Sequence, residues 1–283
     1  MTSKLALLLF LGRLAAQQPD WIAAGHRAFD RDNSQEAAAD FERALQANLR
    51  AGVPAADLLH LRVTLATAYM EAGDYRNMEI VLREAQDSVV EPSGISKAEI
   101  LNAWSALHLK LGQLSDAEAD LQQARRIVQE SPNPGDLLPT VLHNLAAVEM
   151  RLGRSANSLD HEQTALGVWE KTLPSDHPAL IRAWASLASL QYLMDRAREA
   201  QSSIQRALAA AETRYGLKHP IIADLLESEA VVLDKLKSKK DARQARERAL
   251  KIRAATARPA RDSLAWSARE ATPPGESVYL RSK

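Results

Sequence analysis

Small and bulky residues alternate along this chain at helical spacing, and the same arrangement returns at a nearly fixed interval. Its clearest sign is a set of six alanines, which we call the repeat alanines: Ala44, Ala85, Ala124, Ala165, Ala207 and Ala249. Mostly bulky residues lie three positions before them, and mostly small residues lie seven positions before them. Offsets of three, four and seven share one face of a helix, so each alanine is predicted to lie in an amphipathic helix.

A second helix is predicted upstream of each repeat alanine. Nineteen positions before the alanine is another small residue, in turn Gly25, Ala66, Ser105, Ala146, Ala188 and Ala230. Between the two helices, Gly73, Gly112 and Gly153 are expected to close the first helix in the left-handed conformation. Prolines cluster between units, where they are tolerated, and the pair His177-Pro178 returns one unit later as His219-Pro220. Each unit is therefore predicted to be helix, short turn, helix.

A fixed interval of this length predicts a repeat array over residues 18–255, with units starting near 18, 59, 98, 139, 181 and 223. The sixth unit carries Glu229, Lys237 and Arg246 where earlier units are mostly apolar, which is typical of a solubilising end cap. A basic binding patch over Lys235 to Lys240 is the other interpretation of that unit. Residues 256–283 are rich in proline and poor in apolar residues, so we expect a mostly disordered tail.

The segment 1–16 has the features of a secretory signal peptide. A basic start at Lys4 precedes the apolar run Leu5 to Leu11, and small residues end at Ala16, where cleavage is expected. Export to the periplasm or the medium is the favoured location, with a cytoplasmic location as the alternative. The apolar run is too short to span a bilayer, which needs about 20 apolar residues.

Composition narrows the function without naming it. Lys plus Arg and Asp plus Glu both number 36, and the balance argues against a nucleic-acid protein or a polybasic membrane-surface protein. The chain has no cysteine, so disulfides and thiolate chemistry are excluded. No phosphate-binding loop, nucleophile elbow or zinc-binding helix motif is present, and the seven histidines are dispersed. We therefore expect no catalytic residue, no metal site and no cofactor, and we expect His177 and His219 to cap their loops.

The pattern resembles the tetratricopeptide repeat. It matches best in Trp21, Ala24 and Gly25 with Ala37 and Phe41, and again around Leu65, Ala66 and Tyr69. The long repeat interval, the motif Asn144-Leu145-Ala146 and the two His-Pro loops are similar to the kinesin-light-chain type of this repeat. The resemblance implies an all-α, right-handed superhelical solenoid of about six helix pairs. Armadillo or HEAT repeats have a similar length, but they lack the fixed small-residue positions.

The resemblance also implies a concave groove lined by the first helix of each pair. The leading candidates for binding a peptide there are Asn102, His143, Asn144, Met150, Arg151, Arg182 and Tyr192. In this repeat type groove asparagines bind a peptide backbone; Asn144 matches that position and Asn102 lies one position from it. The same reading adds Ile22, His26, Phe29, Thr64, Thr67, Met70, Ala106, Leu109, Ala147, Ser186, Ser189, Glu227 and Asp234.

These expectations lead to a function hypothesis. The chain is a non-catalytic, monomeric scaffold that holds a peptide or protein segment in its groove, with Arg151 and Arg182 available to an acidic group. The Lys and Asn positions of the chaperone-tail clamp are not both present, which argues against chaperone-tail binding. Two alternatives stay open: an architectural or self-assembling repeat protein, and an enzyme with a site built in the groove.

Overall fold

In the computed structural model, the structure describes residues 20–88, 94–132, 135 and 137–256. The predicted signal peptide and the predicted tail beyond residue 256 lie outside these residues. The described part of the chain is built from α-helices with one 3₁₀ turn and contains no strand, which confirms the expected all-α repeat fold. It divides into two compact units, residues 1–90 and residues 91–283, which are described separately.

The N-terminal unit contains two helix pairs. Its elements are α2 (Trp21–Asp30), α3 (Ser34–Arg50), the 3₁₀ turn η1 (Ala55–Leu58), α4 (Leu59–Ala72) and α5 (Tyr75–Ser88). Gly25 in α2 is buried against the ring of Phe41 in α3, and a Cβ atom at Gly25 would lie 2.7 Å from that ring. The small position of the repeat is thus a glycine here because the two helices approach closely.

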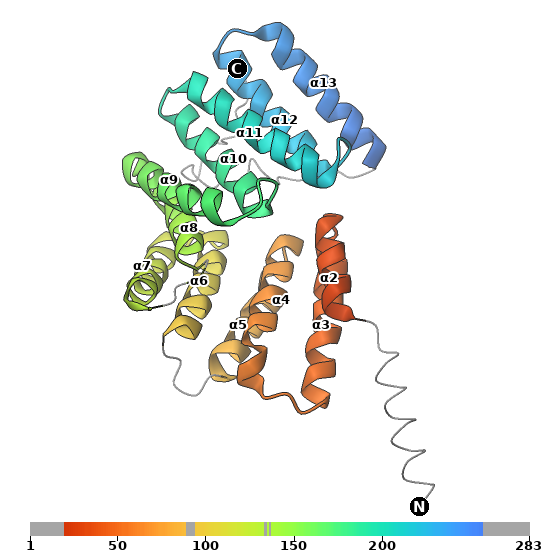
Figure 1. The fold of residues 1–283 in the computed structure, drawn as a ribbon, viewed down its shortest axis with the longest axis vertical. Coiled ribbons are helices and arrows are strands. Elements are labelled where there is room, and N and C mark those ends of the chain that lie inside the picture. The colour runs from red at the N-terminus through yellow and green to blue at the C-terminus, as the bar shows by residue number, and fades with distance from the viewer. Residues whose placement is uncertain (1–19, 89–93, 133–134, 136, 257–283) are drawn as a thin grey trace, which may run out of the picture. The chain divides into compact units, whose positions relative to one another are not determined.

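The C-terminal unit contains four helix pairs, in which consecutive helices pack side by side (Figure 1). Its elements are α6 (Ile95–Lys110), α7 (Leu114–Glu130), α8 (Leu137–Arg151), α9 (Ser155–Thr172), α10 (Pro178–Leu193), α11 (Ala197–Tyr215), α12 (Pro220–Lys235) and α13 (Lys239–Thr256). In each pair the second helix contains the repeat alanine. All six repeat alanines are buried, with at most 3% of their surface exposed.

The turns inside the pairs use two kinds of residue. Gly73, Gly112 and Gly153 adopt φ angles of +78°, +76° and +75°, which confirms that they end the first helix in the left-handed conformation. In the other pairs non-glycine residues take this conformation, with φ angles of +55°, +64° and +64° at Asp32, Asp195 and Lys237. Three of the six turns therefore carry a side chain in a conformation that glycine adopts with less strain.

The two His-Pro loops start helices in the same way. His177 Nδ1 accepts a hydrogen bond from the backbone N–H of Ala179, at 3.2 Å, and His219 Nδ1 accepts one from Ile221, at 3.3 Å. The following proline occupies the first helical turn, where its missing N–H costs nothing. The expected capping role of both histidines is confirmed.

Ion pairs connect each second helix of the C-terminal unit to the second helix of the next pair. Each joins residues that lie 36 positions apart: Glu118 with Arg154, Glu170 with Arg206, and Glu212 with Arg248. Glu170–Arg206 and Glu212–Arg248 join the same two repeat positions, so the last two junctions share one register.

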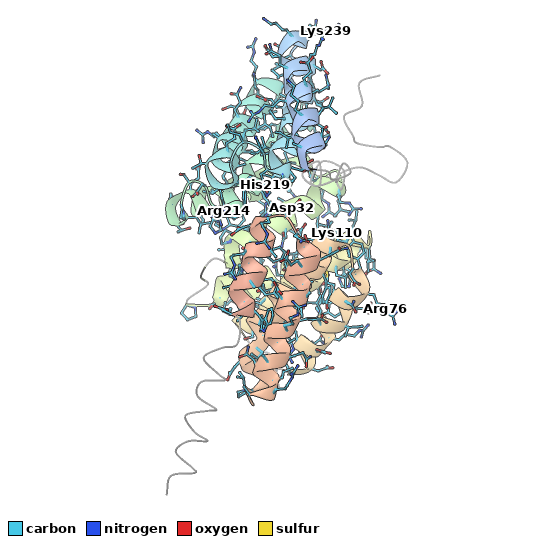
Figure 2. All side chains as sticks on the ribbon, turned by 90° about the vertical axis from the view of Figure 1, so that its right-hand side faces the viewer. Asp32, Arg76, Lys110, Arg214, His219 and Lys239 are labelled. Carbon is cyan, nitrogen blue, oxygen red and sulfur yellow. The ribbon has the colours of Figure 1, made fainter. Side chains whose placement is uncertain are left out.

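The last pair is more polar than the others on its outer side. Lys239, at the start of α13, lies at the outer end of the C-terminal unit and points into solvent (Figure 2). On its inner side, Glu229 of α12 is half-buried, and burial raises the pKa of its carboxyl despite a hydrogen bond with Gln205 and the charge of Arg248. The folded chain therefore holds the Glu229 proton more tightly than the unfolded chain does.

Replacement of Glu229 by glutamine is expected to stabilise the protein at neutral pH. A raised folded-state pKa means that ionised Glu229 opposes folding above that pKa, and this penalty disappears as pH falls below the ordinary glutamate value of about 4.3. Urea unfolding at about pH 7 and about pH 3.5 should thus show a gain in unfolding free energy only at the higher pH. Glu130→Gln, at an exposed site near the end of α7, is the matched control and should be neutral at both.

Candidate functional site

The first helices of the C-terminal unit bring Asn102 and Asn144 together. The side-chain amide of Asn144 in α8 donates a hydrogen bond of 2.8 Å to the side-chain oxygen of Asn102 in α6. Within its repeat, Asn102 lies one position earlier than Asn144 does. The two first helices therefore pack with a shift of one position. Both side chains are half-buried, and their hydrogen bond does not use the amide nitrogen of Asn102 or the amide oxygen of Asn144.

Arg182 lies on the following first helix, α10, and is exposed. Among the described residues no ion pair or hydrogen bond joins it to another side chain. In the stack, α10 is the next first helix after α8, the helix of Asn144. We call Asn102, Asn144 and Arg182 the asparagine–arginine surface. It presents an amide donor, an amide acceptor and a cation along adjacent helices.

Arg151 and Tyr192 belong to the ends of first helices. A guanidinium nitrogen of Arg151 donates to the backbone carbonyl of Leu109, at 2.5 Å, near the end of α6. The Lys235 ammonium donates to the carbonyl of Tyr192, at 3.0 Å, and lies 4.3 Å from the centre of its ring. Both cations satisfy carbonyls at a helix end, and this structural role occupies Arg151 and the ring face of Tyr192.

His143 and Met150 require a correction. Both lie in α8, but His143 is 7% exposed and Met150 is 3% exposed, so neither side chain is presented to a groove. His143 Nδ1 donates to the carboxylate of Glu162 in α9, at 2.9 Å, and its ring lies 5.6 Å from that of Trp169. Met150 packs against Leu190 of α10. Helix α8 is apolar and buried on nearly all sides. A residue on the face opposite the small repeat residues is therefore not necessarily exposed.

Many of the other residues assigned to the groove are engaged or buried. Thr64, Thr67 and Ser189 donate to carbonyls of their own helices, one turn back. Glu227 and Asp234 form ion pairs with Arg253 and Arg246 of α13. Buried members of the set are Leu109, Ala147 and Ser186. In the N-terminal unit Ile22 and His26 are exposed, and the His26 ring lies 5.1 Å from the Phe41 ring in an edge-on contact.

Polar groups between α8 and α9 form a network that the sequence did not predict. His161 Nδ1 donates to Glu149, at 2.7 Å, while its Nε2 accepts from Arg125 of α7, at 3.1 Å. His161 thus bridges α7 and α8 through its two ring nitrogens. The related contacts of His108 with Asp120 and of Gln191 with Ser203 also join residues 12 positions apart. Pairs of polar residues 12 positions apart in the sequence would have indicated these contacts.

The sequence reasoning also missed a pocket of about 420 Å³ between α9, α10 and α11. Trp184 and Leu187 of α10 line it, as do Leu166 and Gly167 of α9. The sequence feature that could have indicated the pocket is Gly167, a glycine that lies within a helix and not at one of the expected turns. Within the described ranges, no cluster of three or more histidine and acidic side chains could hold a metal ion, and no helix is long and apolar enough to cross a membrane.

Comparisons with known proteins found one matching family model and several similar solved structures. A family model for the tetratricopeptide repeat matches residues 137–213, which contain α8, α9, α10 and most of α11. Among solved structures, BtubC (BKLC) from P. vanneervenii has a TM-score of 0.61 at 18% identity, covering 86% of this chain and 96% of that one. A kinesin-light-chain-like protein of Podospora anserina with nearly identical TPR-like repeats has a TM-score of 0.55 at 19% identity, covering 72% and 98%.

A Rap protein complexed with competence and sporulation factor has a TM-score of 0.61 at 14% identity, covering 84% of this chain and 74% of that one. No curated sequence is significantly similar to the chain. At these identities the structural similarity shows the fold. The family model matches the helix pairs whose repeat alanines, turns and His-Pro loop are described above. Residues 137–213 therefore match the tetratricopeptide repeat family, and the described part of the chain shares its fold with the solved repeat structures.

Proposed function

We propose that the chain is a non-catalytic scaffold that binds an extended peptide or protein segment on the asparagine–arginine surface. The observation that carries the proposal is the hydrogen bond between Asn144 and Asn102. It holds both amides in fixed orientations, with one N–H donor of Asn102 and the oxygen of Asn144 directed away from the bond. A peptide backbone requires a donor and an acceptor at close spacing, and these two amides supply them.

Arg182 adds a charge preference to this surface. Its guanidinium is exposed, and a carboxylate of the bound segment can accept two parallel hydrogen bonds from it. Tetratricopeptide repeats commonly bind proteins or peptides, and a related fold was solved in complex with competence and sporulation factor. Families of this repeat are typically non-catalytic. The segment that we propose therefore carries an acidic side chain or its terminal carboxylate near Arg182.

The double variant Asn144→Ala/Arg182→Ala tests the proposal. Partners captured by the wild-type chain from an extract of its own host should bind the variant at least about tenfold more weakly in calorimetry, the loss expected from one charged hydrogen-bonding group. Both residues are half-buried or exposed, so far-UV circular dichroism and the melting temperature should stay close to wild type. Unchanged affinity for every captured partner would remove this surface as the binding site.

Control measurements separate the remaining interpretations. Lys251→Ala, at an exposed site on α13, is the matched control and should leave affinity unchanged. Light scattering during size-exclusion chromatography distinguishes the monomeric scaffold that we propose from a self-assembling repeat protein. N-terminal sequencing of protein recovered from cells tests the proposed export, which predicts that the mature chain begins at Gln17.

A further inference from the structure

The pocket between α9, α10 and α11 lies on the opposite side of α10 from the asparagine–arginine surface. Successive helical residues are about 100° apart, so Trp184 and Leu187 point away from Arg182. The pocket is lined by these two side chains of α10, by α9 from Gln163 to Glu170 and by α11 from Glu199 to Arg206. Whatever occupies it makes contacts that a ligand of the asparagine–arginine surface does not make.

Two residues that line the pocket differ from those at the equivalent positions of the neighbouring junctions. Gly167 lies two positions after the repeat alanine of α9, and the equivalent residues are Arg126 in α7 and Ala209 in α11. A Cβ atom at Gly167 would meet no other atom within 4 Å, so neither packing nor backbone conformation requires a glycine there. Glycine within a helix is less favourable than alanine. Its presence leaves one wall of the pocket open.

Trp184 supplies the second wall, where the equivalent residues of α8 and α12 are Leu142 and Leu226. Its indole face already holds a cation, because the Arg206 guanidinium lies 4.4 Å from the ring centre. The same contact recurs in the first pair, where the Arg43 guanidinium lies 4.9 Å from the Trp21 ring. In both cases the tryptophan lies in the first helix of the pair, and the arginine directly precedes the repeat alanine of the second helix.

The lining of the pocket carries one more carboxylate than guanidinium. Glu170 of α9 and Glu199 of α11 line it together with a single cation, Arg206. The nearest oxygen of Glu170 is 3.4 Å from Arg206, and both side chains are largely exposed, at 44% and 59%. Glu199 pairs with Arg196, which is exposed to a similar degree. Exposed ion pairs of this kind contribute little stability, so both carboxylates can accept a new cation at small cost.

We propose that this pocket is a second docking site, for an arginine or lysine side chain of a partner protein. The aliphatic stem of such a side chain fits over Leu166 and Leu187, and its charged head reaches Glu170 and Glu199. An acidic side chain would meet two carboxylates, and a purely apolar one would form no hydrogen bond with the polar wall formed by Gln163, Ser202 and the two glutamates. The site does not depend on the function proposed for the asparagine–arginine surface.

A random peptide library displayed on phage, selected on the full-length chain and counter-selected on Gly167→Leu, tests the proposal. The leucine fills the open wall from a position where a side chain meets no other atom, so the variant should fold and melt at or above the wild-type temperature. Peptides retained only by the wild type should share an arginine or lysine. In fluorescence anisotropy, replacing that arginine by its neutral analogue citrulline should weaken binding at least about tenfold.

Two further variants keep the test decisive. Glu170→Gln/Glu199→Gln changes only exposed side chains and should weaken the selected peptides to a similar extent. Asn144→Ala/Arg182→Ala should bind them as the wild type does, even if the proposed function of that surface fails. The proposal is overturned if no peptide distinguishes the wild type from Gly167→Leu, if the selected peptides lack a basic residue, or if citrulline or the two glutamines leave affinity unchanged.

Discussion

Replacement of His143 by leucine is expected to lower the free energy of unfolding by about 3–5 kcal/mol, the range for removing one partner of a buried polar pair. The reason is Glu162, whose side chain is fully buried and whose two carboxylate oxygens lie 2.9 and 3.0 Å from His143 Nδ1. Leucine keeps most of the volume of histidine but donates no hydrogen bond. Urea unfolding of the variant and the wild type measures the difference.

The double variant His143→Leu/Glu162→Leu identifies the cause of that loss. Removing both partners leaves no buried carboxyl without a hydrogen bond, so the double variant should be more stable than His143→Leu alone. Thr164→Leu, at an exposed site on α9, serves as the control and should cost less than about 1 kcal/mol. A double variant no more stable than the single one would show that packing of the imidazole, and not the pair, stabilises α8 against α9.

Substitution of Ala207 by leucine is expected to lower the free energy of unfolding by about 1–3 kcal/mol, because the larger side chain overpacks a close contact between helices. Ala207 of α11 is fully buried in the same core cluster as Ala188 of α10 and Ala230 of α12. For a unit of this size the loss corresponds to a fall of several degrees in melting temperature, which scanning calorimetry resolves.

The matched control for this substitution is Ala209→Leu, two positions further along α11 at an exposed site. Leucine and alanine have similar helix propensities, so the control changes the same residue types without touching the seam. Its melting temperature should stay within about 1 °C of the wild-type value. Equal melting temperatures for the two variants would mean that the repeat alanines are not required by close packing.

The helix pairs were predictable because their signals are local and repeated. The alanine interval, the turn glycines and the His-Pro pairs each occur several times, and each has one structural cause that the structure displays. What the interval did not reveal is where the described chain divides. The alanine spacing across the boundary near residue 90 is 39 residues, against 41 or 42 elsewhere, a difference too small to mark a division into units.

The candidate site was predicted less completely, for a physical reason. Position relative to the packing seam identified Asn144 and Arg182 as accessible, but it also selected His143 and Met150, which the neighbouring helices cover. A helix in the middle of a stack contacts its own partner and the pairs on both sides, so three of its faces are buried. The pocket beside Gly167 exists where a helix face lacks a side chain. A search for periodic residues detects side chains that recur, so it does not detect a missing one.

The ion pairs between successive second helices make a small contribution to the coupling between neighbouring helix pairs. Each ion pair connects one helix pair only to the next, so together they contribute to nearest-neighbour coupling and not to the stability of any single helix pair. Their side chains are partly exposed to water, and salt screens such charges over about 10 Å at moderate ionic strength. Added salt therefore weakens only a small part of this coupling, and the buried apolar contacts between helix pairs keep unfolding of the C-terminal unit cooperative.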